Sequence, residues 1–259
     1  MTLEVIKFMN EIINEYFRKY NDEDTIAILL TGSVGRKEND LYSDIDWVRV
    51  AKNKSSSGFK EKYKGLLFDC RCEKLSDLTT LEWNMNQYFA YFNCYIYYDK
   101  NNKLSHLIDN KRKTWCDYLK KIIAIKLVEC SVYIAFPKEY SELISEVTHF
   151  DKFILRNDFF SAYNCLKIIN NKLIDLFFLI NNQPIPDDKN KYRNIEKYSF
   201  ADDLKKILII PKCNSLSDLY VIYEEYQKVL NLLLEKYKQS FGKEKSYKKI
   251  YYNYRGKIC

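Results

Sequence analysis

The chain contains no glycine between Leu66 and Phe241, although it is 259 residues long. Glycine marks tight turns and close backbone approaches, so a long stretch without it favours helices. Apolar residues recur there at helical spacing, in segments 115–136, 151–180 and 216–237. Upstream, short apolar runs alternate with turn residues, which is typical of strands. We therefore predict an α+β domain over residues 1–108 and an all-α domain over residues 109–259.

The first domain is predicted to hold a small mixed sheet with flanking helices. Apolar spacing predicts helices at 4–20 and 76–91 and strands at 26–30, 43–50, 65–75 and 95–98. The serine-rich stretch 52–60 is predicted to be a loop. Ser33 and Ser76 are each predicted to cap the helix that follows.

Composition narrows the class of protein. Hydrophobic residues make up 47% of the chain and charged residues 30%, a balance typical of globular domains. No apolar run reaches transmembrane length and residues 1–20 lack the pattern of a signal peptide, so we expect a cytoplasmic protein without membrane contact. Cys70 and Cys72 are expected to be reduced thiols, because the cysteines form no disulfide framework. His106 and His149 are expected to be structural.

Two aspartates two positions apart follow a Gly-Ser turn. On one strand, Asp44 and Asp46 would leave the same face, about 7 Å apart. Carboxylates are hard oxygen ligands of the kind that Mg²⁺ prefers. Gly32 would let the backbone approach a phosphate, Ser33 would add a hydroxyl and an N–H, and Arg36 would reach the β- or γ-phosphate. The pattern predicts phosphoryl chemistry assisted by two Mg²⁺ ions.

A third carboxylate is expected on the neighbouring strand, 65–75. Alternation places Asp69 and Glu73 on one face of that strand, with apolar residues and cysteines behind them. Glu73 lies nearer the following helix than Asp69 does. Both remain candidates.

The run from Gly32 to Arg36, followed by the run from Ser43 to Asp46, resembles the G-S…S-D-x-D signature of the DNA polymerase β-like nucleotidyltransferase superfamily. The layout is most similar to that of the antibiotic (aminoglycoside and lincosamide) nucleotidyltransferases and their uncharacterised relatives. Residues 97–104 resemble the turn that closes their catalytic domain, with Asn102 in place of the usual glycine. Residues 177–189 resemble a segment of their helical domain.

This resemblance implies an adenylyltransferase-type enzyme that modifies antibiotics and so confers antibiotic resistance. It would transfer a nucleoside monophosphate from a nucleoside triphosphate, ATP being expected, to a hydroxyl of a small molecule, and release pyrophosphate. Asp44, Asp46 and Asp69 would be the catalytic residues and would bind two Mg²⁺ ions, and Lys189 would hold the triphosphate or the substrate. The resemblance favours Asp69 over Glu73, because strands of the family usually carry an acid between two apolar residues at this point. Glu129 is a candidate for the general base. A monomer and a homodimer both remain open.

Other acceptors are also considered. The formal net charge of +7 does not favour a polycationic small molecule. Basic residues alternate with tyrosines in the tail 243–255, which would suit RNA, so transfer to a tRNA end or to a protein side chain is an alternative. Without such a role the tail is expected to be a solvated chain end. A nucleotide-binding module without catalysis is disfavoured, because it needs no paired carboxylates.

Overall fold

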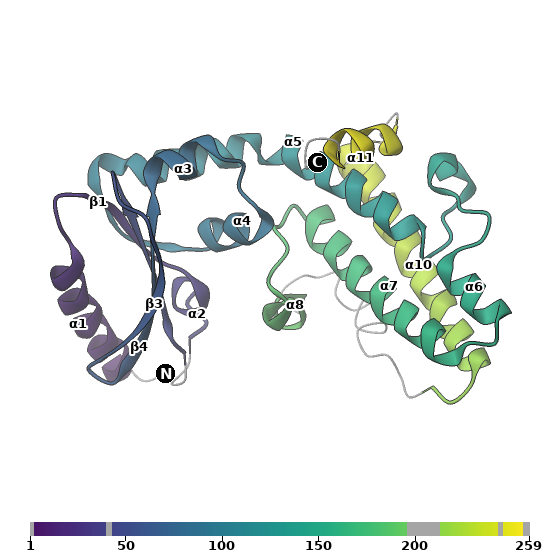
Figure 1. Cartoon of the computed structure of the whole chain (residues 1–259), viewed down its shortest axis with the longest axis horizontal. Helices are drawn as coiled ribbons and strands as arrows, with labels where there is room; N and C mark the ends of the chain where they lie inside the picture. The colour runs from purple at the N-terminus through teal and green to yellow at the C-terminus, as the bar shows by residue number, and fades with distance from the viewer. Residues whose placement is uncertain (1–2, 40–42, 196–212, 243–245, 256–259) are drawn as a thin grey trace. The chain divides into compact units, whose positions relative to one another are not determined.

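The structure is a computed structural model that describes residues 3–39, 43–195, 213–242 and 246–255 (Figure 1). The chain divides into two compact units, Met1–Thr114 and Trp115–Cys259. The division falls inside helix α5 (Lys103–Ser131) and downstream of the predicted boundary at 108/109. Helix α5 also starts earlier than the predicted helix 115–136, and its first turns belong to the first unit. None of the helices in the described ranges has the length and apolarity needed to cross a membrane.

The first unit is built on a five-stranded sheet in the order β3-β4-β2-β1-β5. Strands β2 and β4 run parallel, whereas the other neighbouring pairs are antiparallel. The mixed sheet and its helices confirm the predicted fold class. The strand bounds are β1 (Thr25–Leu30), β2 (Ile45–Ala51), β3 (Ser56–Tyr63), β4 (Leu66–Lys74) and β5 (Tyr95–Asp99).

The prediction of a loop over residues 52–60 is wrong, because β3 begins at Ser56. Strand β3 lies at the edge of the sheet and pairs antiparallel with β4. Edge strands tolerate polar residues, so this strand lacks the apolar signal of a central one. Lys64 (φ 46°) and Gly65 (φ 88°) form the turn between the two strands. Positive φ at both central residues is the geometry that a tight hairpin requires.

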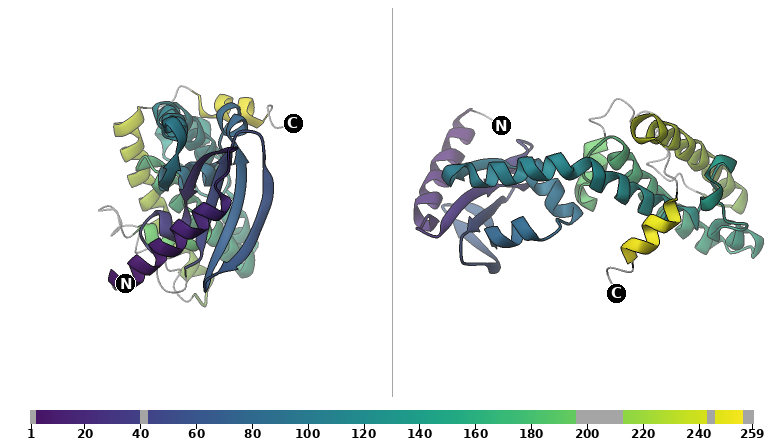
Figure 2. Two further views of the ribbon diagram at one scale, coloured as in Figure 1. Left: turned by 90° about the vertical axis from the view of Figure 1, so that its left-hand side faces the viewer. Right: turned by 90° about the horizontal axis from the view of Figure 1, so that it is seen from above.

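Helix α1 (Leu3–Tyr20) covers one face of the sheet (Figures 1 and 2). The Tyr16 ring is fully buried and stacks on Phe68, with 3.8 Å between ring centroids. Its hydroxyl lies 3.0 Å from the Cys70 thiol, which is free and buried, as expected for a reduced cysteine. Ile45 and Trp47 pack into the same cluster. Because side chains alternate along a strand, Asp46 must leave the opposite face.

The helix predicted at 76–91 is two helices, α3 (Leu75–Thr80) and α4 (Met85–Phe92). Lys74 rather than Ser76 is the N-cap of α3. The break has a local cause, because Asn84 and Gln87 form a capping box that starts a new helix. Trp83 is buried beside it, and its indole N–H donates to the Leu78 carbonyl at 2.9 Å.

Asp99, at the end of β5, starts helix α5. Its carboxylate accepts hydrogen bonds from the backbone N–H groups of Leu104 (3.1 Å) and Ser105 (2.8 Å). The 3₁₀ helix η1 (Lys100–Asn102) lies between β5 and α5. Asn102 adopts φ 55°. This left-handed conformation favours glycine and is tolerated by asparagine, which explains why Asn102 can stand at the position where the resembling turn has glycine.

The described part of the second unit is helical. The helix predicted at 151–180 is again two, because Asn157 adopts φ 55° and the Asp158 carboxylate accepts the Ser161 N–H at 3.0 Å to start a new helix. Helices α7 (Phe159–Ile180) and α10 (Leu216–Phe241) pack together along buried apolar faces. Besides the end of α5, the elements are η2 (Lys138–Leu143), α6 (His149–Leu155), α7 (Phe159–Ile180), α8 (Asp188–Ile195), α10 (Leu216–Phe241) and α11 (Tyr247–Arg255).

The described part of the tail is not the solvated chain end that was expected, because residues Tyr247–Arg255 form α11. Tyr247 is 2% exposed, and its ring lies 6.0 Å from Tyr140 and 6.5 Å from Tyr237. Its backbone N–H donates to Glu142 Oε2 at 3.0 Å. Burial of this aromatic ring anchors the helix to the rest of the unit.

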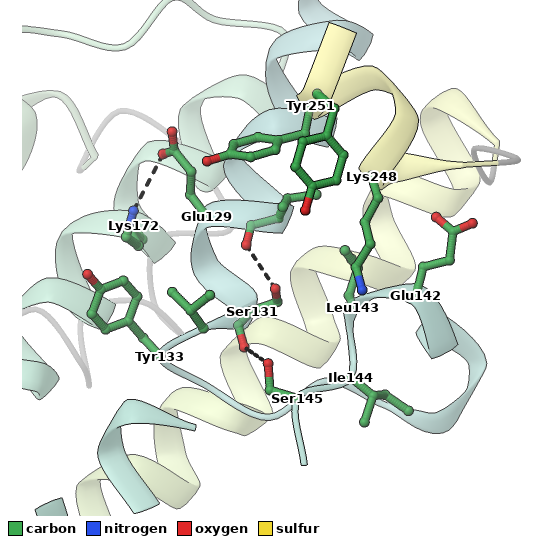
Figure 3. A pocket seen from close by; sticks show the side chains of 13 residues that line it. Glu129, Ser131, Tyr133, Glu142, Leu143, Ile144, Ser145, Lys172, Lys248 and Tyr251 are labelled. Carbon is green, nitrogen blue, oxygen red and sulfur yellow. Dashed lines mark hydrogen bonds and ion pairs between the residues drawn. The ribbon is translucent and has the colours of Figure 1, made fainter. Parts of the chain in front are cut away.

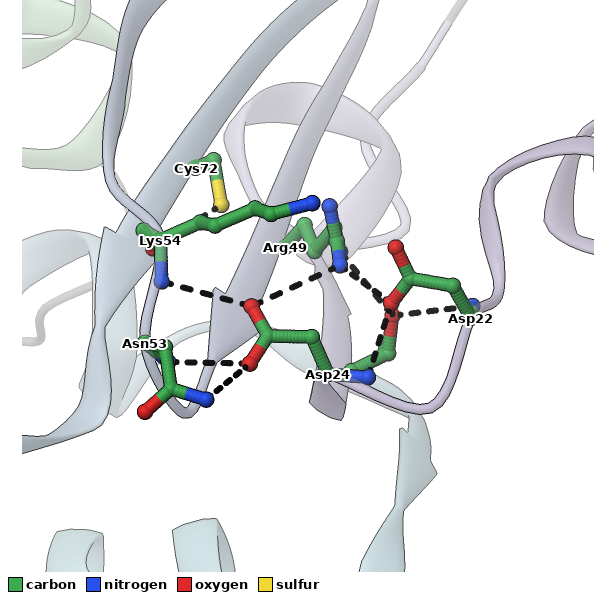
Figure 4. A network of polar contacts seen from close by, with 7 residues as sticks. Asp22, Asp24, Arg49, Asn53, Lys54 and Cys72 are labelled. Carbon is green, nitrogen blue, oxygen red and sulfur yellow. Dashed lines mark hydrogen bonds and ion pairs between the residues drawn. The ribbon is translucent and has the colours of Figure 1, made fainter.

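A polar network ties the start of β1 to the end of β2 (Figure 4). Arg49 Nε donates to the Thr25 hydroxyl at 2.9 Å, and its guanidinium also pairs with Asp22. Asp24 Oδ1 accepts the backbone N–H and the side-chain amide of Asn53, both at 3.0 Å. The network holds together the ends of these two strands that lie away from Asp46.

Glu61 links β3 to α1 and should make stability depend on pH. Hydrogen bonds from Lys19 (2.6 Å), then from Tyr20 and Tyr16, lower the pKa of Glu61 to about 2. A depressed folded-state pKa gives stability that is present above the unfolded pKa and is lost as pH falls through the folded one. We expect the free energy of unfolding to fall between pH 5 and about 2.

Glu61→Gln separates this contribution from those of other carboxylates. The variant should show a shallower loss of stability over that pH window, measured by urea unfolding at each pH. Equal slopes for the two proteins would contradict the assignment.

Candidate functional site

The Gly-Ser turn is the helix α2 (Gly32–Gly35), which packs against the start of β2. Gly32 adopts φ 60°, and a Cβ added there would lie 1.7 Å from Asp46 Oδ2. The Thr31 N–H donates to the Asp46 carbonyl at 2.9 Å. The turn therefore presses its backbone against the Asp46 carboxylate, and only a glycine leaves room for it.

The prediction that Ser33 caps a following helix is wrong, because Ser33 lies inside α2. Thr31 occupies the N-cap position, without a side-chain hydrogen bond. The Ser33 carbonyl accepts the Glu38 N–H at 2.8 Å. A second close approach fixes the turn, since a Cβ on Gly35 would lie 2.2 Å from the Leu30 carbonyl oxygen.

Strand pairing brings two of the predicted carboxylates together. Asp46 on β2 and Asp69 on β4 are direct partners in the parallel register. Neighbouring strands lie about 4.8 Å apart and paired residues face the same side, so both carboxylates leave the face opposite α1. Asp44 precedes β2, which begins at Ile45 rather than at residue 43 as predicted. The ends of an element are the least certain part of a prediction from periodicity, because the sequence pattern can continue beyond the last residue that is paired in the sheet.

Glu73, the alternative third carboxylate, lies elsewhere on β4. Its partner on β2 is Val50, and it is about 13 Å along the strand from Asp69. It pairs with Arg71 at 3.5 Å. The register thus favours Asp69 over Glu73 as the neighbour of Asp46.

Lys60 on β3 lies next to Asp69 and Asp46 in the register, and the sequence did not predict it. It is the antiparallel partner of Asp69, and its ammonium lies 3.1 Å from Asp69 Oδ2. The hydrogen bond to Asp69 raises the pKa of Lys60, and Asp44 and Asp46 raise it further. The Lys64–Gly65 turn sets the register of β3 on β4, so it could have indicated that Lys60 pairs with Asp69. The sequence prediction instead placed a loop over residues 52–60.

The carboxylates of Asp44, Asp46 and Asp69 are donors of the kind that Mg²⁺ prefers, although these side chains do not point toward one common position. Within the described ranges, no group of three or more His, Cys, Asp or Glu side chains is arranged to hold a metal ion. Asp69 instead pairs with Lys60. The glycine that makes room for the Asp46 carboxylate and the hard oxygen donors of Asp44, Asp46 and Asp69 match what Mg²⁺ requires. Binding would need Asp69 to turn from Lys60 toward Asp46.

Arg36, predicted to reach a phosphate, is largely buried. Its Nε donates to Glu38 at 2.9 Å, and its guanidinium lies 5.3 Å from the centroid of the Phe89 ring. The Arg36 side chain is 9% exposed. A phosphate contact would therefore compete with the Glu38 pair.

The segment resembling one in the helical domain of antibiotic enzymes lies at the end of α7. Asn181 accepts a hydrogen bond from Lys236 at 2.5 Å, and Asn182 accepts one from the Trp115 indole at 2.9 Å. Lys189 is exposed on α8. Lys191, two residues on, is 9% exposed and pairs with Asp175 at 2.9 Å and Asp188 at 2.8 Å.

Lys191→Met should lower the free energy of unfolding by about 1–3 kcal/mol, because it removes a cation from a largely buried pair with Asp175. Lys189→Met is the matched control on the same helix. It should leave stability unchanged, since the Lys189 side chain is exposed. Urea denaturation measures both variants, and equal losses would contradict the distinction.

Glu129, the candidate general base, faces a pocket within the second unit (Figure 3). It pairs with Lys172 at 3.5 Å, and the pocket has a volume of about 630 Å³. Lys248 and Tyr251 line it from α11. This pocket belongs to the second unit, whereas the Asp46 carboxylate belongs to the first.

Comparison with known proteins adds little at the level of sequence. No protein-family model matches the chain, and no curated protein matches it. Among solved structures, it is similar to the crystal structure of a nucleotidyltransferase-like protein from Exiguobacterium sibiricum 255-15. The identity is 12%, the TM-score is 0.49, and the match covers 89% of this chain and 77% of that one. A likeness this distant carries no argument, so the proposal below depends on the residues of the site.

Proposed function

We propose that the protein is a Mg²⁺-dependent nucleotidyltransferase that moves a nucleoside monophosphate from ATP to a hydroxyl of a small molecule. One observation carries the proposal. The Asp46 carboxylate lies directly against the backbone of a Gly-Ser turn and is in register with Asp69 on the neighbouring strand. Nucleotidyl transfer needs carboxylates that bind the metal beside a backbone that glycine leaves open to the phosphate, because the metal and the phosphate must lie close together.

The reaction is a displacement at the α-phosphorus. The oxygen of the acceptor hydroxyl forms a bond to the α-phosphorus. The bond between the α-phosphorus and the oxygen that bridges to the β-phosphate breaks. Pyrophosphate leaves with that bonding pair, and the hydroxyl proton goes to a general base. No covalent intermediate with the protein is required.

Each residue has a proposed task in that displacement. When bound, Mg²⁺ would supply the positive charge that lowers the pKa of the attacking hydroxyl and neutralises the leaving pyrophosphate. Asp44, Asp46 and Asp69 would hold it. Gly32 and Ser33 would present backbone N–H groups and a hydroxyl to the phosphates, Arg36 would pair with the β- or γ-phosphate, and Lys189 would hold the triphosphate or the substrate. Lys189 is exposed, as such a contact requires.

A small-molecule acceptor of the antibiotic type is favoured over RNA. The basic tail supported RNA through its alternating tyrosines, but Tyr247 is buried and cannot stack on a base. Tyr252 remains 66% exposed beside the exposed Lys248 and Lys249. The burial of Tyr247 therefore weakens the support for RNA.

Transfer can be tested with nucleoside triphosphates labelled on the α- or the γ-phosphate. The protein would be incubated with Mg²⁺ and with either a panel of aminoglycosides and lincosamides or total tRNA. We expect α-label from ATP on a small molecule, with γ-label found only in pyrophosphate. Label on tRNA and on no small molecule would overturn the acceptor. Absence of transfer and of pyrophosphate release with every acceptor would overturn the reaction class.

A further inference from the structure

Three charged residues form a row across strands β3, β4 and β2. Lys60 on β3 is paired with Asp69 on β4, and Asp69 is paired with Asp46 on β2. Directly paired residues on neighbouring strands face the same side. The Lys60 ammonium lies 3.1 Å from Asp69 Oδ2, so an ammonium already stands beside the proposed metal ligands.

The orientation of β3 is fixed independently of this pair. Glu61, the next residue, leaves the opposite face and binds Lys19 at 2.6 Å and the Tyr16 hydroxyl at 3.0 Å, both on α1. Because adjacent residues of a strand alternate, this anchor holds Lys60 on the carboxylate face. Lys60 is therefore held at this position by the packing of its neighbour as well as by its own ion pair.

Lys60 offsets a charge problem that the proposed site creates. Carboxylates on one face repel one another unless a cation stands among them. Lys60 interacts electrostatically with Asp44 and Asp46 in addition to its hydrogen bond with Asp69. One ammonium thus contacts or attracts all three of the proposed metal ligands.

We propose that Lys60 is the built-in counterion of this carboxylate site, which its ammonium neutralises without metal and which it must leave when a divalent cation binds. The inference rests on the proposed function, because that function assigns a metal to Asp44, Asp46 and Asp69. It follows that Lys60 competes with the metal. Binding must break the Lys60–Asp69 pair, so the lysine lowers the affinity for the cation.

The test measures Mn²⁺ binding directly, without nucleotide or acceptor, by calorimetry and by the spin-resonance signal of free Mn²⁺ in 0.15 M salt. Lys60→Gln should tighten binding about two- to five-fold, because it removes an exposed competing charge. Lys60→Arg keeps the charge and should bind as the wild type does. Lys62→Gln removes the same charge from the same face of β3, but Lys62 makes no ion pair among the described residues, so it should have little effect.

The outcomes separate this inference from the proposed function. Mn²⁺ binding that Asp46→Asn abolishes, but that is equal in wild type and Lys60→Gln, would overturn the role of Lys60 and leave the metal site standing. Weaker binding by Lys60→Gln, or equal tightening by Lys62→Gln, would overturn it as well. Absence of Mn²⁺ binding in every variant would overturn the metal assignment, and the counterion role with it.

Discussion

Asp46→Asn is expected to lower the rate of nucleotidyl transfer by at least about a hundred-fold while the protein stays folded. The amide keeps the shape of the side chain but loses the charge that would bind the metal. The carboxylate lies against Gly32 and opposite Asp69, so no other acid in the described part of β2 stands at this point of the sheet. The measurement is the initial rate of α-label transfer at saturating ATP and Mg²⁺.

Glu73→Gln is the matched control for this prediction. It removes one carboxylate from the same sheet, at a position opposite Val50 rather than opposite Asp46. It should leave the transfer rate within about two-fold of wild type, whereas Asp69→Asn should resemble Asp46→Asn. Full activity of Asp46→Asn, with an unchanged circular dichroism spectrum, would refute the assignment of Asp46.

Gly32→Ala is expected to remove activity to a similar extent and also to destabilise the protein. The left-handed backbone costs a residue with a Cβ about 1–2 kcal/mol. The added methyl group would overlap Asp46 Oδ2, at 1.7 Å, so the carboxylate must move. A displacement of about 1 Å at a reacting centre costs about a hundred-fold in rate. Urea unfolding and the label-transfer rate together measure both effects.

Gly65→Ala separates strain from displacement. Gly65 also has a positive φ, 88°, but a Cβ there would meet nothing within 4 Å. This variant should lose a similar amount of stability to strain and keep its activity. If Gly32→Ala were as active as Gly65→Ala, the contact between the turn and Asp46 would have no role in the reaction.

Local patterns predicted most of the central elements of the first unit. Helix α1 and strands β1, β2, β4 and β5 were predicted from the runs and repeats of their apolar residues, and β1, predicted as a buried strand, is buried at every position. The predicted alternation on β2 is also confirmed, since Ile45 and Trp47 pack under α1. These are properties of neighbouring residues in the chain, so the sequence carries them directly.

Two kinds of feature were missed because their signals are weak or brief. Strand β3 is a polar edge strand whose pairing with β4 gives it structure, so periodicity did not reveal it. The breaks at Asn84 and Asn157 depend on a cap or on a single left-handed residue inside a continuous apolar pattern. Such a pattern reads as one long helix unless the cap is recognised.

The sequence by itself determined which residue types stand beside the turn, since Gly32, Asp44 and Asp46 are close in the chain. Only the tertiary structure placed Asp69 rather than Glu73 opposite Asp46, and Lys60 opposite Asp69. Both positions depend on strand register. A register is set by hydrogen bonds between strands that are distant in sequence, and a shift of one residue would turn each side chain to the other face.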